Sequence, residues 1–121
     1  MSQLVLTVDD SRTMRDMLHL ALSEAGYRVV QAVDGLDGLQ MLEGEQPDVI
    51  VTDINMPRMD GFGFIEGVRK HDKHRATPIL VLTTESDTEK KLRARAAGAT
   101  GWIVKPFNPV KLVDAIRRVA A

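Results

Sequence analysis

Several side chains that can take part in chemistry stand at the ends of short apolar runs. They are Asp9 and Asp10 after residues 4–8, Asp53 after residues 49–51, Thr83 after residues 79–82 and Lys105 after residues 102–104. An uninterrupted apolar run is typical of a strand that is buried on both faces of a parallel sheet. The carboxyl ends of such strands meet at one edge, where open α/β sheets bind ligands. We therefore expect three carboxylates, one hydroxyl and one ammonium group to share a site.

This set of groups is suited to phosphoryl transfer with a divalent cation. Three carboxylates would repel one another and destabilise the fold unless a cation neutralised them. With only oxygen donors available, Mg²⁺ is the expected ion. It could hold a phosphoryl group beside Asp53, and such transfer depends mainly on positioning and charge neutralisation. Asp53 would be the nucleophile that forms an acyl phosphate, while Lys105 and the Thr83 hydroxyl would bind phosphoryl oxygens.

Each of these residues also has an ordinary structural explanation. Asp10 or Ser11 could cap a helix, and Asp53 could cap a turn. Thr83 could simply fill the end of a strand, and Lys105 could be an exposed charge. Each explanation is reasonable for one residue alone. It is much less reasonable for all of them at successive strand ends.

The apolar pattern predicts five strands that alternate with five helices. Expected strands cover residues 4–8, 27–32, 49–51, 79–82 and 102–104, and expected helices cover residues 11–25, 36–44, 61–70, 86–98 and 109–120. Asp60 and Asn108 are expected N-caps, and Ser86 with Glu89 has the spacing of a capping box. The alternation predicts an α/β fold, in which a single five-stranded parallel sheet has helices on both faces.

The bulk composition is that of one globular domain covering residues 1–121. Hydrophobic residues make up 44% of the chain and charged residues 27%. The absence of cysteine excludes disulfides, thiolate metal sites and a cysteine nucleophile. The sequence has no signal-peptide pattern and no run near the ~20 apolar residues of a membrane span, so we expect a cytoplasmic location.

Positive charge is concentrated near the end of the chain. Residues 1–89 hold 8 Lys and Arg against 16 Asp and Glu, giving −8, while residues 90–121 hold 8 against 1, giving +7. Solvated surfaces explain most of these charges, but a basic surface could also steer an acidic protein partner. No aromatic residues are interleaved with the basic ones, so direct DNA binding is not expected.

Taken together, these motifs resemble the receiver domain of two-component response regulators. The matching segments are LTVDDSRTMR, VIVTDINMPRMDG, LTTESD and GWIVKPF, in the order and spacing of that family over essentially all 121 residues. The likeness is greatest to stand-alone chemotaxis regulators of the CheY type. It implies a flavodoxin-like sheet with strand order 2-1-3-4-5, the order for which CheY itself is known.

The resemblance also implies a role for each site residue. Asp53 would accept a phosphoryl group from a phosphohistidine of a sensor histidine kinase. The implied Mg²⁺ ligands are Asp9, Asp10, Asp53 and the backbone carbonyl of Asn55. The Lys105–Pro106 bond is expected to be cis, as in the family.

Thr83 and Trp102 match the family's switch pair, in which the hydroxyl moves toward the phosphoryl group and the aromatic ring turns inward. The change would rebuild the face formed by the fourth helix, fifth strand and fifth helix, by shifting an existing population. Trp102 replaces the usual Tyr or Phe, so its ring could turn more slowly or already be partly buried. Asn55 and Glu85 occupy the positions that tune hydrolysis of the acyl phosphate, and they resemble fast-decaying chemotaxis regulators.

The expected function is a monomeric receiver that relays or drains a histidine-kinase signal in chemotaxis. It would assist its own phosphorylation and dephosphorylation without being an enzyme in the ordinary sense. The flagellar motor switch is a candidate output partner, although Lys91 stands where motor-binding members have an apolar residue. The candidate output surface is basic and contains Lys90, Arg93, Arg95 and Lys111.

The main alternative is a small phosphohydrolase that uses Asp53 on external phosphoesters. Phosphatases of the haloacid-dehalogenase type need a general acid two residues later, and that position holds Asn55, which cannot supply the proton. Nucleotide binding lacks its signature, because no glycine-rich loop follows the first strand. The histidines are predicted to be surface residues: His19, His71 and His74.

Overall fold

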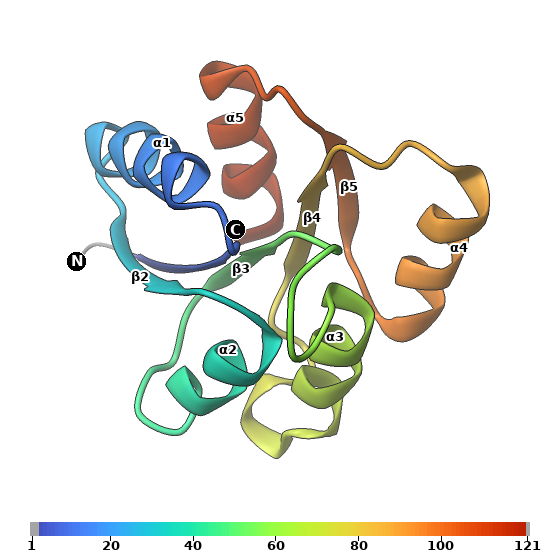
Figure 1. Ribbon diagram of the computed structural model, residues 1–121. Coiled ribbons are helices and arrows are strands. Elements are labelled where there is room, and N and C mark those ends of the chain that lie inside the picture. The colour runs from blue at the N-terminus through green and yellow to red at the C-terminus, as the bar shows by residue number, and fades with distance from the viewer. Residues whose placement is uncertain (1–2, 121) are drawn as a thin grey trace.

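The computed structural model describes residues 3–120, which form one sheet with helices packed on both faces (Figure 1). The strands are β1 (Leu4–Val8), β2 (Arg28–Ala32), β3 (Val49–Thr52), β4 (Ile79–Thr83) and β5 (Gly101–Val104). The helices are α1 (Arg12–Glu24), α2 (Gly35–Met41), α3 (Gly61–Lys70), α4 (Thr88–Ala97) and α5 (Pro109–Ala120), with a short 3-10 helix η1 (Asp72–His74). The expected alternation of strands and helices is confirmed.

All neighbouring strands are parallel, and their order is β2-β1-β3-β4-β5, which confirms the predicted fold class. The register aligns the strand ends. Val8 lies opposite Thr52, and Thr83 lies opposite Val104. The residues that follow these strands therefore emerge at one carboxyl edge of the sheet.

The sheet separates two apolar cores. Ile50 of β3 belongs to the core beneath α2, α3 and α4, whereas Val49 and Val51 belong to the core beneath α1 and α5. Successive side chains of a strand point to opposite faces, so a strand covered on both faces needs apolar residues at every position. This is why β3 has no polar alternation.

Helix α4 is the least firmly packed of the helices. Ala94 is its buried residue, and the Arg93 guanidinium lies 4.0 Å from the centre of the Phe62 ring on α3. The predicted capping box at Ser86 is wrong, because Asp87 is the N-cap and accepts a hydrogen bond from the Glu89 backbone N–H at 2.7 Å. The helix begins at Thr88, which leaves Ser86 outside its first turn.

Two further details differ from the expectations. The polar segment after α3 contains η1, and His74 at its end is only 2% exposed, so the prediction of a surface position is wrong for this histidine. Helix α2 ends at Met41, three residues before the expected end at residue 44. Among the residues described here, no helix is long and apolar enough to cross a membrane.

Candidate functional site

The carboxylates of Asp53 and Asp9 are held by the backbone at the ends of β3 and β1. The Asp53 backbone N–H donates to the Val8 carbonyl at 2.9 Å, and its Oδ1 accepts from the Ile54 N–H at 2.6 Å. Asp9 Oδ1 accepts from the Ser11 N–H at 2.9 Å. Both aspartates are buried. Because strands and backbone donors fix them, their second oxygens are presented to the sheet edge.

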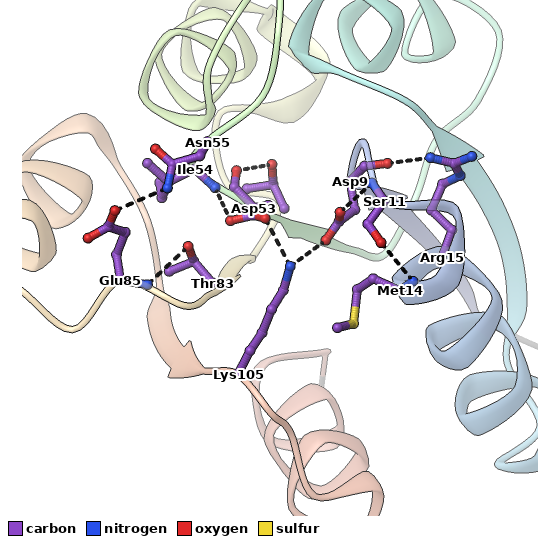
Figure 2. Close-up of polar contacts among 11 residues, drawn as sticks. Asp9, Ser11, Met14, Arg15, Asp53, Ile54, Asn55, Thr83, Glu85 and Lys105 are labelled. Atoms are coloured by element: carbon purple, nitrogen blue, oxygen red, sulfur yellow. Dashed lines mark hydrogen bonds and ion pairs between the residues drawn. The ribbon is translucent and has the colours of Figure 1, made fainter.

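Lys105 joins these two carboxylates (Figure 2). Its Nζ donates to Asp9 Oδ2 and to Asp53 Oδ2, each at 2.9 Å, and its side chain is only 10% exposed. The Lys105 backbone N–H donates to the Thr83 carbonyl at 2.8 Å at the end of β5. The Lys105–Pro106 peptide bond is cis, as expected. One ammonium group therefore lies between two buried carboxylates.

Burial and ion pairing act against each other at this edge. Burial raises the pKa of the Asp9 carboxyl group, and the hydrogen bonds from Lys105 and Ser11 offset only part of that effect. Burial alone would lower the pKa of Lys105, but the hydrogen bonds to Asp53 and Asp9 outweigh it and raise that pKa. The lysine is thus protonated at neutral pH. It provides one positive charge for the several carboxylates around it.

The third carboxylate belongs to Asp10, which is exposed at the mouth of the site. Asp9, Asp10 and Asp53 each offer an oxygen, and these atoms all lie within 4.8 Å of one another. A cluster of hard oxygen donors with excess negative charge fits Mg²⁺. The structure therefore brings together the three side chains expected to bind the metal, while the part expected of the Asn55 carbonyl remains a prediction.

The residues expected to tune and switch the site meet at Glu85. Glu85 Oε1 accepts from Asn55 Nδ2 at 3.1 Å and pairs with Lys90 Nζ at 3.1 Å. The Asn55 bond, followed by the Lys90 bond, lowers the pKa of Glu85. The Glu85 N–H donates to the buried Thr83 hydroxyl at 3.4 Å, and the Glu85 carbonyl accepts from Trp102 Nε1 at 3.1 Å. Sequence reasoning named these residues but missed that one glutamate contacts the others.

A second ion pair near the site was not anticipated. Arg58, in the loop after β3, forms two hydrogen bonds to the buried carboxylate of Asp34 before α2. The sequence offers a weak signal for Asp34, since Asp before a helix is a common N-cap. It offers none for the pairing, because the two residues are far apart in the chain.

Two basic side chains of the candidate output surface contact other residues of the chain. Lys90 is paired with Glu85, and Arg93 stacks on Phe62. Arg93, Arg95 and Lys111 are exposed. A groove beside α4 and β5 is lined by Lys91, Leu92, Ala94, Arg95, Ala99, Thr100, Gly101 and Trp102.

Comparison with solved structures places the chain among known proteins. It is 47% identical to the chemotaxis response regulator CheY4 of Vibrio cholerae, with a TM-score of 0.93, over 98% of this chain and 99% of that one. The receiver domain of the sensor histidine kinase PA1611 from Pseudomonas aeruginosa is 26% identical, with a TM-score of 0.92, over 99% of this chain and 98% of that one. Its structure has a magnesium ion coordinated in the active site cleft.

A curated relative is longer than this chain. The probable transcriptional regulator ycf27 of Guillardia theta is 40% identical over 115 residues, which are 95% of this chain and 44% of that protein. The chain thus spans less than half the length of that relative. The family model for the response regulator receiver domain matches residues 5–117. With this match and the similarity to CheY4, the chain belongs to the response regulator receiver domain family and is CheY-like.

Proposed function

We propose that this chain is a single phosphoacceptor domain in which Asp53 accepts a phosphoryl group from a histidine kinase. A receiver domain implies such a kinase and an output target. The observation that carries the proposal is the Lys105 ammonium group, which bridges Asp53 and Asp9 at 2.9 Å. It is a cation placed beside the proposed nucleophile, where negative charge would collect during transfer.

The positions of the side chains support the following chemistry. An oxygen of Asp53 would form the new bond to phosphorus as the bond to the donor histidine nitrogen breaks. Lys105 would then donate to a phosphoryl oxygen, and the Thr83 hydroxyl, whose oxygen accepts from the Glu85 N–H, would donate its hydrogen to another. Asp53 is only 8% exposed, so the acyl phosphate would form in a site with little surrounding water.

We propose Asp9, Asp10, Asp53 and the Asn55 carbonyl as the ligands of Mg²⁺. The bound ion would neutralise charge on the phosphoryl oxygens. Three observations support the assignment: the donors are all oxygens, the three carboxylates are clustered, and the related PA1611 domain binds magnesium in its cleft.

The output surface is proposed to be the face of α4, β5 and α5, acting as a monomer on an acidic protein partner. Its exposed basic side chains, Arg93, Arg95 and Lys111, support such a partner. The likeness to CheY4 supports a role in chemotaxis, as either motor control or a phosphate sink. Pull-down of the flagellar motor switch protein, with and without phosphorylation, separates these two roles. Binding that depends on phosphorylation supports motor control.

The phosphohydrolase alternative is not favoured. The chain belongs to a family of signalling domains. At the position where the hydrolase would require a general acid it has Asn55, whose side-chain amide donates a hydrogen bond to Glu85. Steady turnover of a phosphomonoester would revive that alternative.

The proposed function is tested by labelling with acetyl phosphate and Mg²⁺, followed by intact-protein mass spectrometry. Wild type should gain one phosphoryl group, whereas Asp53→Ala should gain none. Asp72→Ala is a matched control, because it removes an exposed aspartate outside the site and should be labelled normally. Labelling of Asp53→Ala at the wild-type level would refute the assignment.

A further inference from the structure

The loop of residues 54–60, between β3 and α3, is fastened to a neighbouring loop on each side. Toward α4, Asn55 Nδ2 donates to Glu85 Oε1 at 3.1 Å. Toward α2, Arg58 Nε donates to Asp34 Oδ2 at 2.6 Å and Nη2 donates to Asp34 Oδ1 at 3.1 Å. The second attachment has no part in the function proposed above.

The Asp34 carboxylate is a strong anchor for Arg58. Its side chain is only 4% exposed, and its Oδ1 also accepts from the Asp37 N–H at 2.9 Å as the N-cap of α2. The Arg58 hydrogen bonds, followed by the Asp37 bond, lower the pKa of Asp34, so the carboxylate is ionised at neutral pH. A two-pronged arginine bond to a buried carboxylate fixes orientation as well as distance. The Arg58 side chain itself is 58% exposed, so the pair is buried only on the side of Asp34.

Arg58 forms this bond from an unusual backbone conformation. Arg58 has φ of 64°, a left-handed conformation that is uncommon for residues other than glycine, asparagine and aspartate. Next to it, the Gly35 N–H donates to the Met59 carbonyl at 3.2 Å. A Cβ at Gly35 would lie only 2.7 Å from Met59 Cγ. The loop is therefore seated directly on the start of α2.

The same loop is closed tightly against the proposed phosphoacceptor. The Gly61 N–H donates to the Ile54 carbonyl at 2.8 Å, and a Cβ at Gly61 would overlap the Asp53 carbonyl oxygen. A shift of the loop at Arg58 therefore has few ways to be absorbed before it reaches Asn55 and Asp53. Packed backbone of this kind transmits small displacements.

We propose that Arg58 is a positioning residue, whose fork to Asp34 holds residues 54–60 where Asp53 and the Asn55 carbonyl bind Mg²⁺. This inference rests on the proposed function, because it assigns Arg58 to the same metal site. The competing explanation is that the fork only stabilises the fold. The two explanations predict different Mg²⁺ affinities for folded variants that lack this bond.

The test is calorimetric titration of the folded protein with Mg²⁺ alone. Arg58→Asn removes the guanidinium, and asparagine tolerates the left-handed backbone. Asp34→Asn keeps a capping oxygen for the Asp37 N–H while removing the charge that attracts Arg58. Each variant should weaken Mg²⁺ binding by about 10-fold, the lower end of the loss seen when groups that orient metal ligands are removed, because Arg58 acts on the ligands only through the loop backbone. The double variant should bind Mg²⁺ as tightly as the single variants do, since both substitutions remove the same bond.

Arg75→Asn is the matched control, because it breaks an exposed arginine–aspartate pair, Arg75 Nη2 to Asp72 Oδ1 at 2.6 Å, outside the site. It should leave the Mg²⁺ affinity unchanged. Wild-type Mg²⁺ affinity in Arg58→Asn, even with a lower melting temperature, would overturn the inference. Effects of the two single variants that add in the double variant would also overturn it.

Failure of this inference can be told apart from failure of the proposed function. Acetyl phosphate labelling of wild type and Asp53→Ala tests the function itself. Normal, Asp53-dependent labelling together with an unchanged Mg²⁺ affinity in Arg58→Asn would reject only the role of Arg58. Labelling that does not depend on Asp53 would reject the function, and the role of Arg58 with it.

Discussion

The indole Nε1 of Trp102 donates a hydrogen bond to the backbone carbonyl of Glu85 at 3.1 Å. The Trp102 ring is half-buried against the core beneath α4. The carbonyl belongs to the loop that carries Glu85, whose side chain holds Asn55 beside the acidic cluster. An aromatic residue on β5 is thus connected through one glutamate to the loop that follows Asp53.

Replacing Trp102 by Phe should loosen the loop before α4. The change removes the indole N–H, and a lost hydrogen bond of this kind costs about 1 kcal/mol. Phe is also smaller than Trp at a position packed against the core, so urea unfolding should show a free energy of unfolding that is lower by at least about 1 kcal/mol. Amide hydrogen exchange should become faster at residues 85–97. Tyr27→Phe serves as a control. It removes the tyrosine hydroxyl just before β2 and should leave amide exchange in α4 unchanged.

Replacing Lys105 by Met should destabilise the protein strongly at neutral pH. Asp9 and Asp53 would be left as buried carboxylates without their cation, and breaking a buried pair in this way costs about 3 kcal/mol. The loss of stability should be smaller at pH 5, because burial raises the pKa of Asp9, and protonation of this carboxylate removes part of the repulsion. Urea unfolding at both pH values measures the effect. Lys73→Met is the control, because Lys73 is exposed. An equal loss of stability in that variant would contradict the explanation.

Mg²⁺ should raise the melting temperature of the wild-type protein. A ligand that binds only the folded state stabilises it by about 2.7 kcal/mol at 100 times its dissociation constant. Asp9→Asn should remove most of this response, because it takes one charged oxygen donor from the cluster. Thermal unfolding with Mg²⁺ and with Na⁺ at matched ionic strength distinguishes binding from screening. A full response in Asp9→Asn would place the ion elsewhere.

His74 should make the protein less stable in mild acid. Burial, followed by the nearby charge of His71, lowers the pKa of His74 from its usual 6.5, so the folded state favours the neutral ring. Below pH 6.5 the unfolded chain therefore binds more protons than the folded one. The contribution of His74 to the free energy of unfolding is fully present above pH 6.5, and it should be lost as the pH falls from 6.5 toward the lower pKa of the folded state.

This pH dependence is checked by urea unfolding of wild type and His74→Gln between pH 7.5 and pH 5.0. The variant cannot ionise at this position, so its stability should change less over that interval, whatever its stability at pH 7.5. His19→Gln is the control, since His19 is exposed on α1. A His74→Gln variant with the wild-type pH dependence would show that other groups are responsible.

Local patterns in the sequence were sufficient to predict the order of the elements and the edge where the site lies. Apolar runs without alternation require cover on both faces, and amphipathic segments between them supply the helices. The positions of Asp9, Asp53 and Lys105 then follow from chain order alone, because each stands one residue after a strand. Parallel strands necessarily bring such residues to the same edge.

Tertiary structure alone decided which side chains touch. Arg58 and Asp34 are 24 residues apart, and Asn55 and Glu85 are 30 apart, so no local pattern connects them. His74 lies in a polar segment that indicates exposure, yet packing buries its ring. These contacts depend on how loops from separate elements meet at the edges of the sheet. The sequence therefore determined where the chemistry lies, while the packing of loops determined what holds it in place.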